Sequence, residues 1–227
     1  MKKNKSKLNR QSISNALFWL GILVLLFCVF NIGLNWYHNH QLTAQAEKEI
    51  KLANEGKPSP APATIKPSAD DINKYTVAPG MPRFLRVDSL NVLSRVRQVG
   101  IDKTGAIGVP TNVYDVAWYN KSSLPGAPGA AVIDGHVSSW TTHGVFYSLT
   151  SIKINSIVQV EMGNGTLYNY KVVKKQVYSY DNVDMNALLS PVNPKLPGLN
   201  LITCTGSVIK GTNEFNQRAI VFTQLVK

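Results

Sequence analysis

Residues 157–178 read IVQVEMGNGTLYNYKVVKKQVY, two runs of alternating apolar and polar residues joined by a Gly-Asn-Gly link at 163–165. Alternation with a period of two is typical of a β-strand with one buried face. A short link of Gly and Asn between two such runs favours a tight hairpin turn. This stretch therefore predicts two antiparallel strands, at 157–162 and 166–178, and with them a β-sheet domain.

The same pattern continues on both sides of the hairpin. Short runs rich in β-branched and aromatic residues are separated by clusters of Gly, Pro, Asn and Asp, which is the pattern of an all-β domain. Several short strands in one domain favour a closed barrel or a sandwich over an α/β fold. We therefore expect an all-β domain with short helices over residues 79–227. The predicted strands are 83–87, 92–99, 113–117, 130–136, 157–162, 166–178, 199–204 and 218–225, with one helical turn at 186–189.

The N-terminal part of the chain has the pattern of a membrane anchor. Residues 1–10 contain five basic and no acidic residues, and residues 16–37 carry no charge. About 20 apolar residues span a bilayer, and basic residues stay preferentially on the cytoplasmic side. We therefore expect residues 1–15 in the cytoplasm, a transmembrane helix at 16–37 and everything after it outside the cytoplasm. The alternative is a cleaved signal peptide with its apolar core at 16–30.

Residues 38–78 separate the predicted anchor from the predicted domain. They contain few large apolar residues, and several prolines with intervening Ala and Ser lie between 58 and 67. Such a composition favours an extended spacer. We interpret this segment as a tether that holds the domain away from the membrane.

The distribution of charge argues against a nucleic-acid partner. The formal net charge is +11, of which residues 1–10 contribute five positive charges. Residues 38–74 are neutral, and residues 75–227 carry 14 basic and 8 acidic residues, a net +6. The excess of positive charge in the domain is scattered, whereas a nucleic-acid-binding protein is expected to cluster it.

Cys204 is the only cysteine outside the predicted membrane segment, because Cys28 lies within 16–37. A single thiol on an exported domain has no disulfide partner there, so it is either a buried structural side chain or a chemical group. Cys204 follows the apolar run 199–202 and precedes the small residues at 205–207. We therefore predict an accessible sulfur at the end of a strand.

His136 and Arg218 also lie at predicted strand ends. His136 closes the strand 130–136, and Arg218 begins the strand 218–225. Taken singly, a histidine here fits a surface position and an arginine fits a solvated charge. Together with the Cys204 thiol they could supply a proton shuttle and an anion stabiliser for a nucleophile. His143, in a polar loop, is the rival histidine.

These residues resemble the motifs of the sortase family, the bacterial cysteine transpeptidases. The family motif Thr-Leu-x-Thr-Cys, followed by an Arg in the next strand, is similar to residues 200–204 and Arg218, with Asn200 in place of the first Thr. The family's Gly-His segment is similar to residues 135–137. The resemblance spans about 79–227 and implies a closed eight-stranded β-barrel with Cys204, His136 and Arg218 as catalytic residues. Because the chain has a single predicted N-terminal anchor, it most resembles the class F or class E sortases.

The resemblance also implies an activity and partners. A sortase of the bacterial cell membrane would cleave secreted proteins at a Leu-Pro-x-Thr-Gly-like signal, between Thr and Gly, through a thioacyl intermediate on Cys204. It would then transfer them to an amine of a peptidoglycan precursor or a pilin. No cofactor or metal is expected. Asp102, Asp115 and Glu161 could contribute to a calcium site, but they lack a recognisable loop spacing.

Two other classes of protein remain open from the sequence. An L,D-transpeptidase is also a β-rich exported cysteine enzyme, but its signature places Ser, Gly, Cys and Arg within a few residues, whereas Cys204 and Arg218 are fourteen residues apart. The second alternative is a tethered β-domain that binds a cell-envelope component without catalysis. Such a domain would form no acyl adduct on Cys204.

Overall fold

The computed structural model describes residues 63–102, 105–139 and 141–226, together with four residues of the N-terminal part. The chain forms two compact units, Met1–Glu55 and Gly56–Lys227. In the first unit the described residues are Trp19, Ile22, Phe27 and Phe30, and all four are helical. Among the described residues, no helix has the length and apolar character needed to cross a membrane. The predicted cytoplasmic segment, the rest of the predicted anchor and the tether before residue 63 lie outside the described residues.

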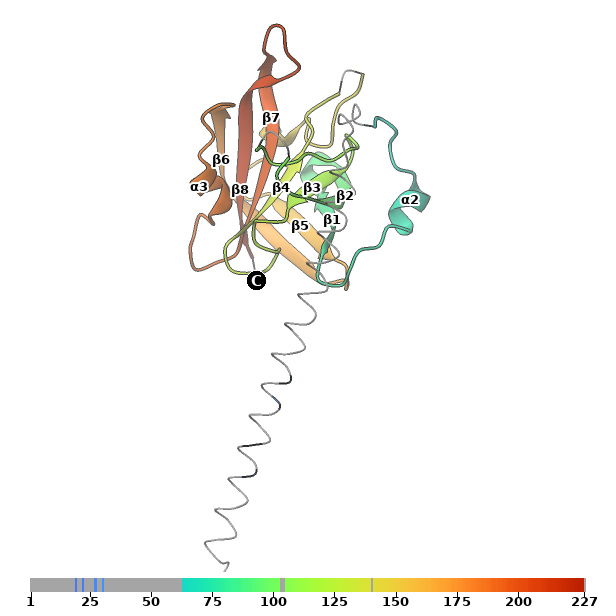
Figure 1. Cartoon of the computed structure of the whole chain (residues 1–227), viewed down its shortest axis with the longest axis vertical. Coiled ribbons are helices and arrows are strands. Elements are labelled where there is room, and N and C mark those ends of the chain that lie inside the picture. The colour runs from blue at the N-terminus through green and yellow to red at the C-terminus, as the bar shows by residue number, and fades with distance from the viewer. Residues whose placement is uncertain are drawn as a thin grey trace, which may run out of the picture. The chain divides into compact units, whose positions relative to one another are not determined.

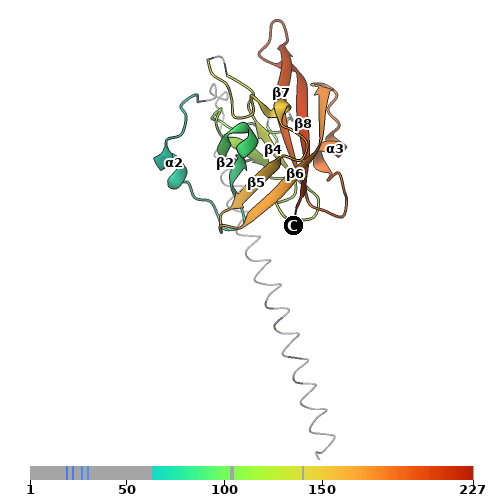
Figure 2. The ribbon, with the colours of Figure 1, turned by 180° about the vertical axis from the view of Figure 1, so that it is seen from behind.

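Eight strands of the second unit close into one barrel (Figures 1 and 2). The order around the barrel is β1-β2-β3-β4-β7-β8-β6-β5. The predicted closed, mainly β fold is therefore confirmed. The strands are β1 (Pro82–Val87), β2 (Val92–Val99), β3 (Val116–Tyr119), β4 (Ala130–Gly135), β5 (Ile157–Met162), β6 (Leu167–Ser179), β7 (Gly198–Val208) and β8 (Phe215–Leu225).

The predicted hairpin at 157–178 is the β5–β6 pair, which is antiparallel with Val160 opposite Tyr168.

The strand predicted at 113–117 is wrong in its position, because β3 begins only at Val116. The backbone N–H of Val113 instead donates a hydrogen bond to the carbonyl of Ala63, and Asp115 forms ion pairs with two arginines. Pairing with a distant segment was not visible in the local pattern.

Two pairs of neighbouring strands are parallel, β2–β3 and β4–β7, and the other pairs are antiparallel. A parallel pair needs a long crossover connection. Between β4 and β7 that connection contains β5, β6 and α3 (Met185–Leu189). The topology therefore brings the end of β4 beside β7, although the two strands are far apart in the sequence.

Side chains on β4, β7 and β8 alternate between the two faces of the barrel wall. Odd-numbered residues such as Ile133, Leu201 and Val221 belong to the interior core. Even-numbered residues such as Val132 and Ile220 form a second apolar cluster on the outer face, where Leu188 of α3 packs against them. The outer face of these three strands is the one that carries the candidate site.

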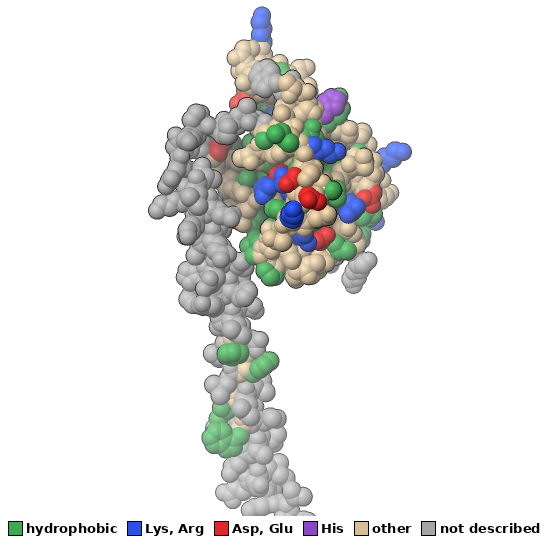
Figure 3. All heavy atoms as spheres, turned by 90° about the vertical axis from the view of Figure 1, so that its right-hand side faces the viewer, with side chains coloured by type: hydrophobic (Ala, Val, Ile, Leu, Met, Phe, Trp, Pro, Cys, Tyr) green, Lys and Arg blue, Asp and Glu red, His purple; other side chains and the backbone are tan. Residues whose placement is uncertain are grey.

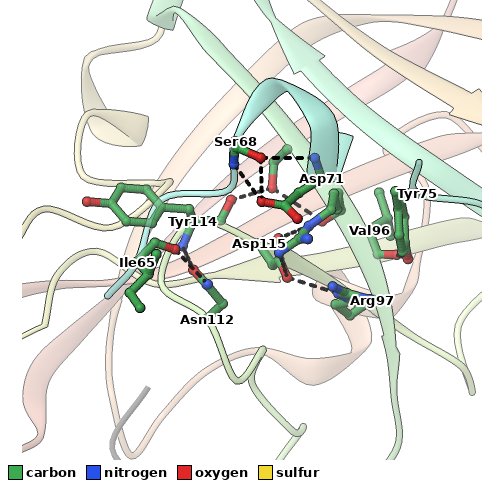
Figure 4. Close-up of polar contacts among 11 residues, drawn as sticks. Ile65, Ser68, Asp71, Tyr75, Val96, Arg97, Asn112, Tyr114 and Asp115 are labelled. Atoms are coloured by element: carbon green, nitrogen blue, oxygen red, sulfur yellow. Dashed lines mark hydrogen bonds and ion pairs between the residues drawn. The ribbon is translucent and has the colours of Figure 1, made fainter. Parts of the chain in front are cut away.

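The N-terminal segment of this unit lies along the barrel rather than apart from it. Residues 63–78 contain α2 (Ala69–Asn73), which starts with a capping box between Ser68 and Asp71. Figure 4 shows how the segment is attached: Asn112 donates a hydrogen bond to the carbonyl of Ile65, and Tyr75 donates one to Val96. The last part of the predicted tether is thus attached to the domain.

Ion pairs hold Asp115 and Glu161, two of the three acidic residues named above for a calcium site. Asp115 is 2% exposed and accepts hydrogen bonds from both Arg95 and Arg97, while Glu161 pairs with Arg83 at 3.2 Å. Figure 3 shows basic and acidic side chains intermixed on this side of the barrel, without a patch of one sign. Within the described part of the chain, no cluster of three His, Cys, Asp or Glu side chains is arranged to hold a metal ion.

Candidate active site

Cys204 and Arg218 lie directly opposite each other on the neighbouring strands β7 and β8. Both side chains are partly exposed on the outer face. The prediction that Cys204 ends its strand and Arg218 begins one is wrong, because β7 continues to Val208 and β8 begins at Phe215. The hairpin continues past the site through a bulge at Gly206, whose φ of +84° lets the strand change register there. The site therefore lies within a ladder and not at its end.

His136 reaches the same face from the third strand. It follows β4 directly, and β4 pairs with β7 so that Asp134 stands opposite Ile202. Continuing this parallel register by two residues places His136 at the level of Cys204. The hydroxyl of Thr203 donates a 2.7 Å hydrogen bond to the carbonyl of Gly135, which joins the two strands next to the site. The structure thus brings the three predicted residues to one level of the barrel wall.

The backbone of His136 is held by the loop that follows it. Its carbonyl accepts a 2.9 Å hydrogen bond from the backbone N–H of Phe146. Gly144 approaches so closely that a Cβ there would lie 2.2 Å from the same carbonyl oxygen. Only glycine fits at position 144 without displacing His136.

The His136 ring is neutral at neutral pH and has a defined tautomer. Its Nε2 lies 2.8 Å from the carbonyl oxygen of Pro110. Because a carbonyl oxygen can only accept, Nε2 carries the hydrogen and Nδ1 keeps a free lone pair. Burial lowers the pKa of His136, and the hydrogen bond to Pro110 opposes this shift only in part. Nδ1 is therefore the ring nitrogen that can accept a proton.

Cys204 rests as a thiol. Burial raises the pKa of Cys204 above its ordinary value, the positive charge of Arg218 lowers it, and the carboxylates of Asp134 and Glu214 raise it. A reactive cysteine needs a positive neighbour that favours the thiolate. Arg218 is that neighbour, and two acidic groups oppose it.

The Arg218 guanidinium is fixed by backbone carbonyls of its own strand. Its Nη1 donates hydrogen bonds to Phe215 at 2.8 Å and to Gln217 at 3.1 Å, and its Cζ lies 6.0 Å from the centre of the Tyr180 ring. Nε and Nη2 donate to no other residue in the described part of the chain. One edge of the planar group is thus occupied, and the other can bind an anion or a carbonyl.

The Asn200 side chain, at the position where the family motif has a Thr, has a structural role. Its side chain is fully buried between β7 and α3, where Nδ2 donates to the carbonyls of Leu188 at 2.7 Å and Ser190 at 3.0 Å. These carbonyls belong to the C-terminal end of α3, which has no helical partner for them. Asn200 therefore attaches the connection between β6 and β7 to the wall below Cys204, a role that the sequence motif did not reveal.

Asp134 is a candidate functional residue that the sequence analysis did not identify. His143, the rival histidine, has a different partner. The period of two along β4 puts Asp134 on the face of His136, so its position in an otherwise apolar strand was a usable signal. His143 stacks on Tyr147, with ring centres 3.5 Å apart and planes at 8°.

A family comparison identifies the protein class. The sequence model of the sortase-domain family matches residues 85–226. The chain belongs to the sortase family. Sortases are cysteine transpeptidases, so the family expected from the motifs is confirmed, whereas the assignment to class F or E stays a prediction. No curated protein sequence matches the chain.

Solved sortase structures share the barrel. Sortase C-1 from Actinomyces oris is 21% identical, with a TM-score of 0.50, and the match covers 81% of this chain and 95% of that chain. A lid mutant of sortase A from Corynebacterium diphtheriae is 19% identical, with a TM-score of 0.51, and the match covers 81% and 91% of the two chains. At these identities the likeness concerns the fold alone.

Proposed function

We propose that this sortase is a membrane-anchored enzyme that cleaves a Leu-Pro-x-Thr-Gly-like signal between Thr and Gly and transfers the protein to an amine of the cell wall. The observation that carries the proposal is the placement of Cys204 opposite Arg218, with His136 directly after the adjoining strand β4, at the same level when the register of β4 and β7 is continued. Three chemical groups on one face supply a nucleophile, a proton carrier and a cation. The resemblance of residues 200–204 and 135–137 to the family motifs supports the same roles.

The first half of the reaction forms the thioacyl enzyme. The proton of the Cys204 thiol passes to Nδ1 of His136, and the thiolate attacks the carbonyl carbon of the Thr residue. The tetrahedral intermediate then collapses with cleavage of the Thr–Gly bond, and the imidazolium gives its proton to the departing amine of Gly. Because thiol and imidazole both rest neutral, this proton transfer precedes or accompanies the attack.

The second half releases the product to a new amine. His136, again neutral, removes a proton from the incoming amine as its nitrogen attacks the thioester carbonyl. The C–S bond breaks, an amide forms, and Cys204 regains a proton. The same residue thus acts as acid in one half and base in the other.

Arg218 stabilises the charge that develops on the substrate. Its Nε and Nη2 groups donate to no residue in the described part of the chain, so they can donate to the oxyanion or to the signal backbone. A single oxyanion donor is worth about 3 kcal/mol in other enzymes. The planar fork also fixes the orientation of what it binds.

The proposed location follows from the N-terminal pattern. Basic residues before the apolar segment at 16–37 place the catalytic domain outside the cytoplasm, in a single-pass protein of the bacterial cell membrane. Secreted proteins with a sorting signal would be the substrates, and a peptidoglycan precursor or a pilin would supply the acceptor amine. Class F or E is the subclass proposed.

The test incubates the full chain in detergent with short sorting-signal peptides and candidate amines, and reads the products by mass. We expect cleavage between Thr and Gly, transfer to one amine class and an acyl adduct on Cys204. Cys204→Ala should abolish all three, whereas Cys28→Ala, the matched control, should retain them. Turnover by Cys204→Ala would overturn the role of the nucleophile. Absence of adduct and product with every peptide would favour the non-catalytic binding domain.

A further inference from the structure

Asp134 lies in the wall of the site, one level below the three proposed catalytic residues. On β4 it is flanked by Ile133 and Gly135, which face the interior, so its side chain points to the outer face. It stands opposite Ile202 on β7, and Cys204 is two residues further along that strand. From strand spacing and rise, the Cα atoms of such diagonal neighbours are about 8 Å apart. Asp134 and Cys204 therefore share one face at close range.

The carboxyl group has an apolar setting. Ile202 and the fully buried Ile220 continue its level across β7 and β8, and Ala117 stands opposite it on β3. Asp134 takes no part in the ion pairs found within the described residues, and its hydrogen bond comes from the backbone of Gly135. Asp134 is half-buried, and these apolar neighbours limit the solvation of a carboxylate that has no ion-pair partner in the part of the chain that the structure describes.

The charged and titratable groups that face this carboxyl come from three sides. Arg218 on β8 is the cation that acts on it. Cys204 on β7 is the thiol whose ionisation it opposes, together with the more exposed Glu214 of the β7–β8 loop. His136 lies two residues further along the chain, directly after β4. From β3, Tyr119 shares the outer face, while α3 brings the apolar Leu188.

Burial raises the pKa of Asp134 to about 7, against the opposing effects of the Gly135 N–H and the Arg218 charge. The group therefore changes charge within the range in which an extracytoplasmic enzyme works. When Asp134 is ionised, its negative charge offsets the stabilisation of the Cys204 thiolate by Arg218. When Asp134 is protonated, this opposing charge is gone and Arg218 stabilises the thiolate more strongly.

We propose that Asp134 is a positioning residue that controls the ionisation of Cys204: its carboxylate keeps the nucleophile as a thiol, and its protonation lets Arg218 stabilise the thiolate. This inference rests on the proposed function in taking Cys204 as the nucleophile and His136 as the acceptor of its proton. The proton that Asp134 binds comes from solvent, and the proton that Cys204 loses goes to His136. Asp134 itself touches no substrate atom in this scheme and acts through the charge of Arg218.

The test measures alkylation of Cys204 by iodoacetamide from about pH 6 to 9, on either side of the Asp134 pKa of about 7. The full chain is used, and the peptide that contains Cys204 is read by mass so that Cys28 does not contribute. We expect Asp134→Asn and wild type to react alike below about pH 6, because both are then neutral at this position. Above about pH 8 the variant should react faster, by roughly tenfold, since only the wild type carries the carboxylate.

Glu214→Gln is the matched control. It removes the other carboxylate that raises the pKa of Cys204, but Glu214 is exposed and solvent screens its charge. Loss of this screened surface charge should change the alkylation rate by one small factor at every pH. Curves for Asp134→Asn and wild type that coincide, or that differ by a constant factor, would overturn the proposal.

A second measurement tests the proposal even if Asp134→Asn does not fold. The carboxyl carbon of Asp134 in the wild-type chain should titrate by ¹³C NMR near pH 7, and in Arg218→Gln at a higher pH, because the cation is gone. A midpoint near 4, or no response to the loss of Arg218, would contradict the proposal. Neither alkylation nor NMR requires a sorting signal, so the inference can fail while transpeptidation succeeds, and the reverse.

Discussion

In the proposed mechanism Arg218 has two sets of partners at once, which a lysine could not satisfy. Nη1 is bound to the carbonyls of Phe215 and Gln217, which leaves Nε and Nη2 for the substrate. An ammonium is a point charge on a flexible stem and would satisfy one set only. We expect Arg218→Lys to lower kcat/KM by about 100-fold or more while the protein stays folded. Transfer rates with a peptide and an amine measure this. The control is Arg86→Lys, an exposed arginine in a loose 3.9 Å ion pair, which should keep full activity. A loss of less than threefold in Arg218→Lys would contradict the role.

Asn200 is expected to contribute stability from below the site. Asn200→Ala leaves the buried carbonyl of Leu188 and the partly buried carbonyl of Ser190 without their donor, which should cost about 2–3 kcal/mol of unfolding free energy. Asn200→Thr restores one donor and should lie between. Asn193→Ala, at a partly exposed asparagine of the same connection, should change the free energy of unfolding little. Urea unfolding measures all three. Equal stability of Asn200→Ala and wild type would show that α3 does not depend on this side chain.

At the scale of elements, the β7–β8 hairpin is the part that the local sequence pattern described least well. The pattern stops the strands at Cys204 and Arg218, because Gly206 and the polar loop after it interrupt the apolar alternation. In the structure the ladder continues through a bulge that tolerates both features. By contrast, β5 and β6 were predicted nearly to the residue, since their turn and alternation are local properties.

The bulge predicts a difference between two glycines of the hairpin. Gly206 and Gly211 both have φ near +85°, so alanine is strained at either position. At Gly206 a Cβ would also lie 2.3 Å from Oδ1 of Asn216, which accepts the backbone N–H of Ser207, whereas at Gly211 nothing lies within 4 Å. We expect Gly206→Ala to be about 1–2 kcal/mol less stable than Gly211→Ala and to lose alkylation rate at Cys204. Thermal unfolding and iodoacetamide labelling test this. Identical behaviour of the two variants would mean that only φ matters.

At the scale of the whole molecule, the buried groups of the site give stability a dependence on pH. The pKa of Asp134 is about 7 in the folded chain and 3.8 in an ordinary setting, so between these values the folded state binds more protons than the unfolded state. Stability from this group is therefore present below about pH 4 and lost as the pH rises through 7. His136 acts in the opposite direction. Its folded pKa lies below 6.5, so its contribution is lost as the pH falls below that value.

Removing the Asp134 charge should reverse the first effect. Asp134→Asn is expected to be more stable than wild type at about pH 8, by on the order of 3 kcal/mol, and equal to it near pH 4. Urea unfolding of both proteins at the two pH values measures the difference, in which all other carboxyl groups cancel. A difference that is the same at both pH values would show that packing and not ionisation is responsible.

The sequence by itself determined the kind of fold and the names of the proposed catalytic residues. The alternation, the turn residues and the short motifs around His136, Cys204 and Arg218 are local features, so they can be recognised in the sequence alone. Only the tertiary structure decided how these residues face one another, because the parallel pairing of β4 with β7 joins segments that a long crossover separates. The same pairing places Asp134 on the face of the barrel wall that carries Cys204 and Arg218. Its raised pKa arises from burial and from charges on other strands, and neither is encoded in the residues next to it in the chain.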